Sequence, residues 1–258
     1  VLIGNGDGTF QAHKDYATGR YPHGIALGDF NGDHAPDIVE TNEGDNTVGV
    51  FLNNGDGTFG TMKTYTTPGY PYSVATGDFN GDGNTDIAVT GYNENAVGIL
   101  IGKGDGTFKT YKQYGTGAAP DVVLAYDFNG DGTLDLATTN YNNGQTGSVS
   151  ILLGKGDGSF GAHTDYPVGL GPDGLAIGKV TGDKNVDLAV ADLIGNQLSV
   201  LPGNGDGTFG TAQNFNTDDY PIGVGIGAFH GQKKTRGDVV VSNDLSADAF
   251  FFRNKGCH

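Results

Sequence analysis

The sequence predicts an all-β protein, a β-propeller of five four-stranded blades, and three repeated motifs lead to that prediction. An acidic segment typified by Asp-Phe-Asn-Gly-Asp recurs about every 49 residues. A turn of the form Gly-x-Gly-Asp-Gly-Thr-Phe and a later aromatic residue keep the same period. Repeats of ~40–50 residues made of short strands are typical of propeller blades. We therefore expect a single β-propeller domain over residues 1–258.

The three motifs occur at corresponding positions in each unit. The acidic segment begins at Asp29, Asp78, Asp127, Lys179 and Ala228. The glycine-rich turn lies at residues 4–10, 53–59, 102–108, 154–160 and 203–209. The aromatic residue is Tyr16, Tyr65, Tyr114, Tyr166 or Phe215. This register predicts repeats at about 17–66, 67–115, 116–167, 168–216 and 217–258.

The second unit illustrates the four strands that we expect in every blade. They run near residues 72–77, 86–91, 96–101 and 107–114. Runs such as "VGVFLNN" and "SVSILLG" are apolar on both faces, which indicates strands covered by neighbouring blades. Glycine supplies the positive φ angles that the tight turns between the strands require.

The two ends of the chain predict how the ring closes. Residues 1–3 match the third strand of a unit, and residues 9–16 match the fourth strand that the last unit lacks. We expect the N-terminal strand to complete the last blade, so that residues 1–16 join 217–258 and close the ring. Because the third strand is then present twice, the sequence also allows five blades taken from a longer propeller.

The composition excludes several kinds of partner. The formal net charge is −16, from 30 acidic and 14 basic residues. Such a surface disfavours nucleic acid and anionic membranes. No run of 18 apolar residues is present, so we expect no membrane insertion. Cys257 is the only cysteine, which excludes a disulfide within the chain.

Three of the acidic segments have the side chains of a calcium-binding loop. Asp78, Asn80, Asp82 and Asp86 stand at positions 1, 3, 5 and 9 of one segment. This oxygen-rich set suits Ca²⁺, which takes 6–8 oxygen ligands in flexible geometry. We expect about three Ca²⁺ sites, with ligands Asp29, Asn31, Asp33, Ala35, Asp37, Asp78, Asn80, Asp82, Thr85, Asp86, Asp127, Asn129, Asp131, Thr133 and Asp135. Ala35, Thr85 and Thr133 are the expected carbonyl donors.

An acidic turn capped by its own Asp side chains is the alternative to a metal site. The fourth segment has Lys179 in place of the first ligand, and its ammonium group could pair with Asp183 and Asp187. The fifth segment retains only Asp238. We therefore expect no calcium in the fourth and fifth loops.

The segments "DFNGDGNTD", "DFNGDGTLD" and "GNGDGTF" resemble the FG-GAP, or VCBS, repeats of integrin-like β-propellers. The resemblance covers nearly the whole chain and implies one Ca²⁺ in the loop between the first and second strands of a blade. Similar repeats occur in integrin heads, bacterial surface proteins, calcium-binding propeller lectins and accessory domains of polysaccharide lyases. The resemblance is therefore specific for the fold and leaves several functions open.

The face opposite the acidic loops varies between units, and variable loops on a constant frame often bind ligands. Its Tyr, Asn and Asp side chains suit a sugar, which needs an aromatic surface and paired hydrogen-bonding groups. The candidate ligand residues are His23, Tyr72, Tyr92, Asn93, Asp121, Asn140, Tyr141 and Asp173. Packing between blades remains the alternative for Tyr72, Tyr92 and Tyr141, and it is what we expect for Tyr21, Tyr70 and Tyr220.

These observations predict a calcium-stabilised binding module, secreted or at the cell surface, that recognises carbohydrate or glycoprotein in the manner of a lectin. Two alternatives remain: a structural or adhesive surface domain that binds another protein, and a non-catalytic domain of a polysaccharide-acting enzyme. No acid–base pair stands apart from the metal pattern, so we expect no enzymatic activity within these residues.

Overall fold

The computed structural model describes residues 1–229 and 237–252, which form five antiparallel sheets with almost no helix. Blade 1 contains β1 (Pro22–Gly28), β2 (Asp37–Asn42), β3 (Thr47–Phe51) and β4 (Lys63–Thr66). Blade 2 contains β5 (Val74–Gly77), β6 (Asp86–Gly91), β7 (Ala96–Leu100) and β8 (Lys112–Gly115). Blade 3 contains β9 (Pro120–Tyr126), β10 (Asp135–Asn140), β11 (Thr146–Leu152) and β12 (Thr164–Leu170).

Blades 4 and 5 continue the same order. Blade 4 contains β13 (Pro172–Gly178), β14 (Asp187–Asp192), β15 (Gln197–Leu201) and β16 (Gln213–Asn216). Blade 5 contains β17 (Pro221–Gly227), β18 (Asp238–Asn243) and β19 (Asp248–Phe252). Two single 3₁₀ turns, η1 (Glu43–Asp45) and η2 (Asn142–Gly144), lie in the loops between the second and third strands. The all-β prediction and the succession of five blade-like sheets are confirmed.

Three of the strands predicted in blade 2 match the structure closely, and the fourth is shorter than predicted. The strand over 86–91 matches β6, and those over 96–101 and 72–77 overlap β7 and β5. The predicted strand over 107–114 is reduced to β8, preceded by an isolated bridge between Gly102 and Phe108. The Gly-Asp-Gly turn explains the delay, because positive φ at Gly104 and Gly106 keeps the chain out of the sheet there.

The hydrophobic core lies between neighbouring sheets. Four clusters of buried side chains fill the spaces between blades 1 and 2, 2 and 3, 3 and 4, and 4 and 5. Strands β6, β7, β10 and β14 are buried along their whole length. The prediction that the middle strands are covered on both faces is therefore confirmed.

The glycine-rich turns of blades 2, 3 and 4 dock, through their phenylalanine, on the blade before them. Phe108 packs between Phe30 and Tyr65 of blade 1, with ring centroids 5.4 and 5.1 Å away. The Gly106 N–H donates to the Phe30 carbonyl, and a Cβ on Gly106 would lie 2.6 Å from Leu52 Cδ1. Glycine is needed at this position because its φ is positive and the neighbouring blade is in contact.

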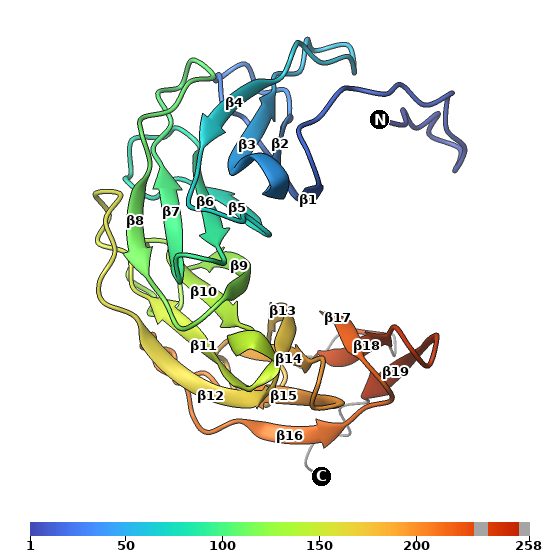
Figure 1. Cartoon of the computed structure of the whole chain (residues 1–258), viewed down its shortest axis with the longest axis vertical. Coiled ribbons are helices and arrows are strands. Elements are labelled where there is room, and N and C mark those ends of the chain that lie inside the picture. Colours follow the sequence, from blue (N-terminus) through green and yellow to red (C-terminus); the bar gives the residue numbers. More distant parts are fainter. Residues whose placement is uncertain (230–236, 253–258) are drawn as a thin grey trace.

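The five sheets follow one another around an arc, with the first strand of each blade on the inner side (Figure 1). The N-terminal segment and β17–β19 lie on opposite sides of an opening in this arc. Residues 9–16 form no strand, and blade 5 has three strands among the described residues. The predicted closure by the N-terminal strand is therefore not seen, because the N-terminal segment lies against blade 1, where Tyr16 packs on Phe51 and Phe59.

Candidate ligand-binding site

The connections between blades have the same unusual backbone in all five units. The residue before each proline at the start of the first strand has positive φ, including Tyr21, Tyr70 and Ala119. Its carbonyl accepts a main-chain hydrogen bond from the loop between the second and third strands, as from Tyr92 to Tyr70 and from Tyr141 to Ala119. This pairing holds two variable loops side by side at one end of each blade. We call this end the rim.

Buried threonines on the second strands of blades 1, 2 and 3 hold the main chain of the residue that follows the proline in the next blade. Thr41 donates to the carbonyl of Tyr72 at 3.0 Å, and Thr90 donates to that of Asp121 at 3.1 Å. Thr139 contacts the Asp173 carbonyl in the same way at 3.4 Å. Because each bond crosses to the next blade, the second strand of one blade positions a rim side chain of its neighbour.

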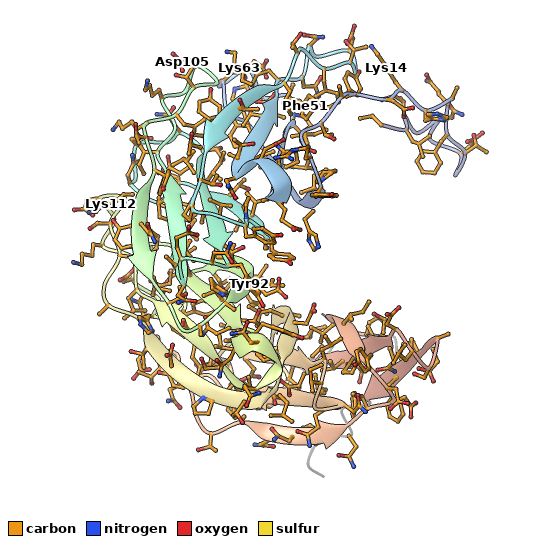
Figure 2. All side chains as sticks on the ribbon, viewed as in Figure 1. Lys14, Phe51, Lys63, Tyr92, Asp105 and Lys112 are labelled. Carbon is orange, nitrogen blue, oxygen red and sulfur yellow. The ribbon has the colours of Figure 1, made fainter. Side chains whose placement is uncertain are left out.

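The rim brings together aromatic side chains from three successive blades. The His23 ring lies 4.7 Å from that of Tyr72, in an edge-to-face arrangement. Tyr72 is 5.3 Å from Tyr92, and Tyr92 is 6.5 Å from Tyr141. Figure 2 shows Tyr92 at the inner side of the arc. These rings form a continuous row, whereas the sequence leaves open whether the tyrosines pack between blades.

Two partly buried carboxyl groups lie beside the aromatic row. Burial, followed by the charge of Asp173, raises the pKa of Asp121 to about 7. Burial also raises the pKa of Asp173, and the charge of His23 opposes this shift. The pKa of Tyr72 rises to about 12, through burial first and then through the charges of Glu43 and Asp121. We call His23, Tyr72, Tyr92, Asp121, Tyr141 and Asp173 the rim cluster.

The structure separates two predicted ligand residues from the rim cluster. Asn140 is 1% exposed, and its amide donates to Ser148 and Ser150 inside blade 3. Its prediction as a rim ligand is wrong, because its position at the end of β10 turns the side chain into the sheet packing. Asn93 lies exposed in the same loop as Tyr92, with its main-chain N–H directed to Gly69.

Three tyrosines that were expected to pack between blades are exposed on the rim. Tyr21, Tyr70 and Tyr220 are 71%, 42% and 38% exposed, because the positive φ before each proline turns these side chains outward. The Tyr70 ring lies 6.3 Å from that of Tyr72, so it extends the aromatic row. Sequence reasoning missed Tyr70, although its place before a variable position was a usable signal.

The opposite end of each blade carries the acidic loops. The ninth residue of each loop starts the second strand and is buried, as for Asp86, which is 0% exposed. Its two carboxylate oxygens accept from the N–H groups of Phe79 and Gly102, at 2.9 and 2.7 Å. Asp37, Asp135 and Asp187 make equivalent bonds. This residue therefore joins the acidic loop to the third strand of its own blade.

The remaining loop residues form a tight series of side-chain to main-chain bonds. The first aspartate accepts from main-chain N–H groups at positions 4 and 6, as Asp78 does from Gly81 and Gly83. Position 6 has positive φ in all three loops, at His34, Gly83 and Gly132. The third and fifth residues also bond each other, as in Asn80 and Asp82 at 2.9 Å. The loop shape is therefore specified by the acids themselves.

The loops fit a cation in donor chemistry and in charge. They present carboxylate, amide and carbonyl oxygens, which are the atoms that Ca²⁺ prefers. The pKa of Asp86 is raised to about 6, mainly by burial and in part by the charges of Asp82 and Asp78. A cation would relieve this repulsion. Within the described part of the chain, however, no three acidic, histidine or cysteine side chains form a group that could hold a metal.

One predicted carbonyl donor is misplaced. The seventh residue of the second loop is Asn84, whereas Thr85 corresponds to Leu134 of the third loop. The Thr85 carbonyl oxygen lies against Gly102, where it would clash with a Cβ, and that of Leu134 lies in the same way against Gly154. In the fourth loop, Thr181 replaces the asparagine and donates to Asp187, and no ion pair of Lys179 occurs among residues 1–229 and 237–252. Most of the fifth loop lies outside the described residues.

Comparison with protein families identifies the repeats. The model of the FG-GAP-like repeat matches residues 36–89, 78–138 and 127–190, which follow the blade register. The chain belongs to this family. A comparison with curated protein sequences gives no significant match.

Solved structures share the fold at low sequence identity. An Agrocybe aegerita lectin, described in specific recognition of non-reducing terminal N-acetylglucosamine, has a TM-score of 0.63 at 22% identity, over 99% of this chain and 71% of the lectin. Virginiamycin B lyase from Staphylococcus aureus has a TM-score of 0.59 at 17% identity, over 98% and 77%. A protein from Lactobacillus plantarum reaches 0.62 at 12% identity, over 97% and 75%. These similarities establish the fold alone.

The described residues 1–229 and 237–252 contain no helix of the length and hydropathy needed to cross a bilayer.

Proposed function

We propose that this FG-GAP-like propeller binds carbohydrate at the rim cluster. The observation that carries the proposal is the convergence of Tyr72, Tyr92 and Tyr141 with Asp121 and Asp173. Aromatic faces accept the apolar C–H surface of a sugar ring, and carboxyl groups accept hydrogen bonds from its hydroxyls. The lectin among the structural neighbours supports this class of ligand.

The rim side chains are held before a ligand arrives. Thr41, Thr90 and Thr139 anchor the main chain of three of them from the neighbouring blade. Preorganisation of this kind lowers the entropic cost of binding. The neutral form of Asp121, favoured by a pKa of about 7, can also donate a hydrogen bond to a sugar oxygen near neutral pH.

We further propose that Ca²⁺ occupies the loops 29–37, 78–86 and 127–135 and stabilises the blades outside the cell. The oxygen donors and the mutual repulsion of Asp78, Asp82 and Asp86 support this assignment. The loops lie at the far end of the strands from the rim, since β1 pairs Gly28 with Asp37 at one end and Pro22 with Asn42 at the other. Extracellular calcium modules bind with Kd of about 10⁻⁴–10⁻³ M, which matches exposed loops of this kind.

The test is a glycan-array screen of the purified chain, with calcium present and after chelation. We expect binding to a defined set of sugars that is lost in Tyr92→Ala and retained in Tyr126→Ala, a tyrosine at the opposite end of its blade. Tyr126 is 39% exposed and Tyr92 is half-buried, and circular dichroism checks that both variants remain folded. A blank array from a folded protein would contradict carbohydrate binding and favour a surface that binds another protein.

The perturbed carboxyl group supports a second candidate function, an enzyme acting at the same rim. A carboxyl group with a pKa near 7 suits general acid–base catalysis, and Asp121 lies beside Asp173 and Tyr72. Virginiamycin B lyase shows that this fold can carry catalysis. Incubation with each array-positive glycan, followed by mass spectrometry, distinguishes the two functions: an unchanged glycan favours a lectin, and turnover lost in Asp121→Asn favours an enzyme.

A further inference from the structure

A cavity of about 560 Å³ lies between blades 4 and 5 beside β19. Val180, Leu198 and Val200 of blade 4 line it, with Val239 and Phe252 of blade 5. Phe215, on the outer strand β16, also contributes to its wall. The cavity is therefore mainly apolar and sits at the outer edge of the last described sheet.

The corresponding space between blades 3 and 4 is filled by a phenylalanine. Phe209 comes from the Gly-Asp-Gly-Thr-Phe turn of blade 4 and lies 5.6 Å from Phe128 and 5.5 Å from Tyr166. In the repeat, Val180 stands at the position of Phe128, and Phe215 stands at that of Tyr166. The cavity is therefore lined at the positions that contact a phenylalanine side chain between blades 3 and 4.

The same arrangement occurs between the earlier blades. Phe160 packs on Phe79 and Tyr114 at 5.7 and 5.4 Å, as Phe108 packs on Phe30 and Tyr65. Three inter-blade spaces therefore hold the phenylalanine of such a turn. In blade 5 the described residues end at the close of β19, before the position of that turn.

Two further turns of this kind occur in the chain. The turn at residues 53–59 packs its Phe59 on Tyr16. The other turn lies at residues 4–10. Its Phe10 is 62% exposed. The segment that carries it is docked on blade 1 as an outer strand docks on the following blade. Tyr16 accepts from the Phe59 N–H and lies 5.6 Å from the Phe59 ring, and a Cβ on Gly57 would lie 2.8 Å from Ile3.

Residues 1–16, which we call the arm, thus reproduce one half of the contacts of an outer strand. The contact of Ile3 with Gly57 has an equivalent in the other blades. Leu52, Ile101 and Leu153 lie 2.6–2.8 Å from where a Cβ would stand on the corresponding glycine of the following blade. In those blades the phenylalanine of the same segment enters the space behind it, toward the preceding blade. The arm already makes its contact with the following blade, which is blade 1. Its Phe10 is exposed and can enter the space behind a preceding blade.

We propose that the cavity binds Phe10 of a second copy of this chain, whose arm adds to β19 as the fourth strand of blade 5. A second copy is the proposed source, because the chain's own arm is held on blade 1, on the opposite side of the opening from β19 (Figure 1). The register of β15 and β16 pairs Val200 with Gln213, which places Lys14 of the added arm opposite Phe251. Such a head-to-tail contact generates rings or filaments of the protein.

Sedimentation velocity over a concentration series of the full chain tests the proposal. We expect reversible association that strengthens with salt, because each copy carries a net charge of −16 that salt screens. Phe10→Asp should weaken the association at least tenfold, and Phe10→Leu should retain it. Phe251→Asp on the receiving side should have the effect of Phe10→Asp, since Phe251 is 63% exposed and its change leaves the core intact. A protein that stays monomeric at every concentration, or that associates equally well with Phe10→Asp, would overturn the proposal.

Disulfide trapping identifies the source of the arm. Chains with Lys14→Cys and chains with Phe251→Cys, both in a Cys257→Ser background, are mixed and oxidised. A mixed dimer supports the second copy, and Gln11→Cys in place of Lys14→Cys serves as the out-of-register control. A chain carrying both cysteines that forms an internal disulfide as a monomer would show that its own arm closes the ring, and would overturn the assignment to a second copy. Failure of both pairings would equally contradict the docking.

Discussion

The acidic-loop end and the rim of each blade differ in how much their side chains vary from one repeat to the next. At the acidic-loop end the same residues recur in the first three blades, and their polar groups are bonded within the same blade, as Asp86 is to Phe79 and Gly102. At the rim the frame recurs while the side chains differ, with His23, Tyr72, Asp121, Asp173 and Ile222 at one repeat position. A position where the backbone is constant and the side chain varies is free to specialise. This difference is the reason to test the acidic loops for a role in stability and the rim for the proposed ligand binding.

The largest effect should follow removal of a buried aspartate at the acidic-loop end. Asp86→Ala leaves the N–H groups of Phe79 and Gly102 without acceptors, so we expect a loss of about 2–5 kcal/mol in the free energy of unfolding. Urea denaturation in EDTA measures it. The matched control is Asp105→Ala in the same blade, an exposed turn residue whose replacement should cost much less stability. Equal losses would remove the distinction between buried and exposed acids in these loops.

Chelation should have the next largest effect, also at the acidic-loop end. Calcium at a free concentration equal to its Kd stabilises a protein by about 0.4 kcal/mol for each site, or about 1.2 kcal/mol for three sites. We expect EDTA to lower the melting temperature by several degrees, at about 2–4 °C per kcal/mol for a chain of this size. Calcium should restore it and magnesium should not. A melting curve that EDTA leaves unchanged would contradict all three calcium assignments.

A pH effect of intermediate size should come from the rim. The pKa of Asp121 in the folded protein is about 7, above the ordinary value of 3.8, so the folded state holds its proton longer than the unfolded state. Asp121 therefore lowers stability progressively as pH rises between 3.8 and about 7. Asp121→Asn should flatten this part of the stability profile, measured by urea denaturation in EDTA.

The control for this pH effect is Asp105→Asn. Hydrogen bonds from Thr107 hold the pKa of Asp105 below 3.8, so its contribution is present above that pH and fades as pH falls. The two substitutions should change the profile with opposite sign. Profiles of wild type and Asp121→Asn that run parallel would show that the Asp121 carboxyl group titrates alike in the folded and unfolded chain.

The smallest effect should be on affinity, through a residue that touches no ligand. Thr90→Val removes the hydroxyl that donates to the Asp121 carbonyl, so we expect sugar binding to weaken by about 1 kcal/mol, roughly fivefold in Kd. Titration calorimetry with an array-positive glycan measures it. Thr76→Val is the matched control, since Thr76 also bonds a neighbouring blade, at Leu27, but away from the rim. A similar loss in both variants would point to a general loosening of the blades.

The repetition in the sequence makes most of the blade predictable. Asp86 stands at a fixed distance from Asp78 and begins an apolar run, so both the loop and β6 follow from local residues. The fourth strand was less predictable, because β8 needs an open edge of β7 and begins only after the Gly-Asp-Gly turn. The prediction of Thr85 as a carbonyl donor was one residue out of register: position 7 of the loop is Asn84, and the Thr85 carbonyl oxygen lies against Gly102.

The candidate site was predictable only in part. The post-proline positions His23, Tyr72 and Asp121 were identified because they vary on a constant frame, and the structure gathers them. Asn140 was also predicted from its polar side chain, yet it ends β10 and lies buried against Ser148 and Ser150. One step along a strand reverses the face on which a side chain lies, and that parity depends on where the strand ends.

The sequence by itself determined the blade: its strand order, its acidic turns and the phenylalanine that docks each turn on the preceding blade. These depend on contacts within one repeat or between successive repeats, and the same residues encode them each time. Only the tertiary structure decided which variable side chains meet at the rim, and on which side of the opening the arm lies. Both depend on how successive blades are rotated about a common centre, and no local run of residues encodes that sum of small rotations.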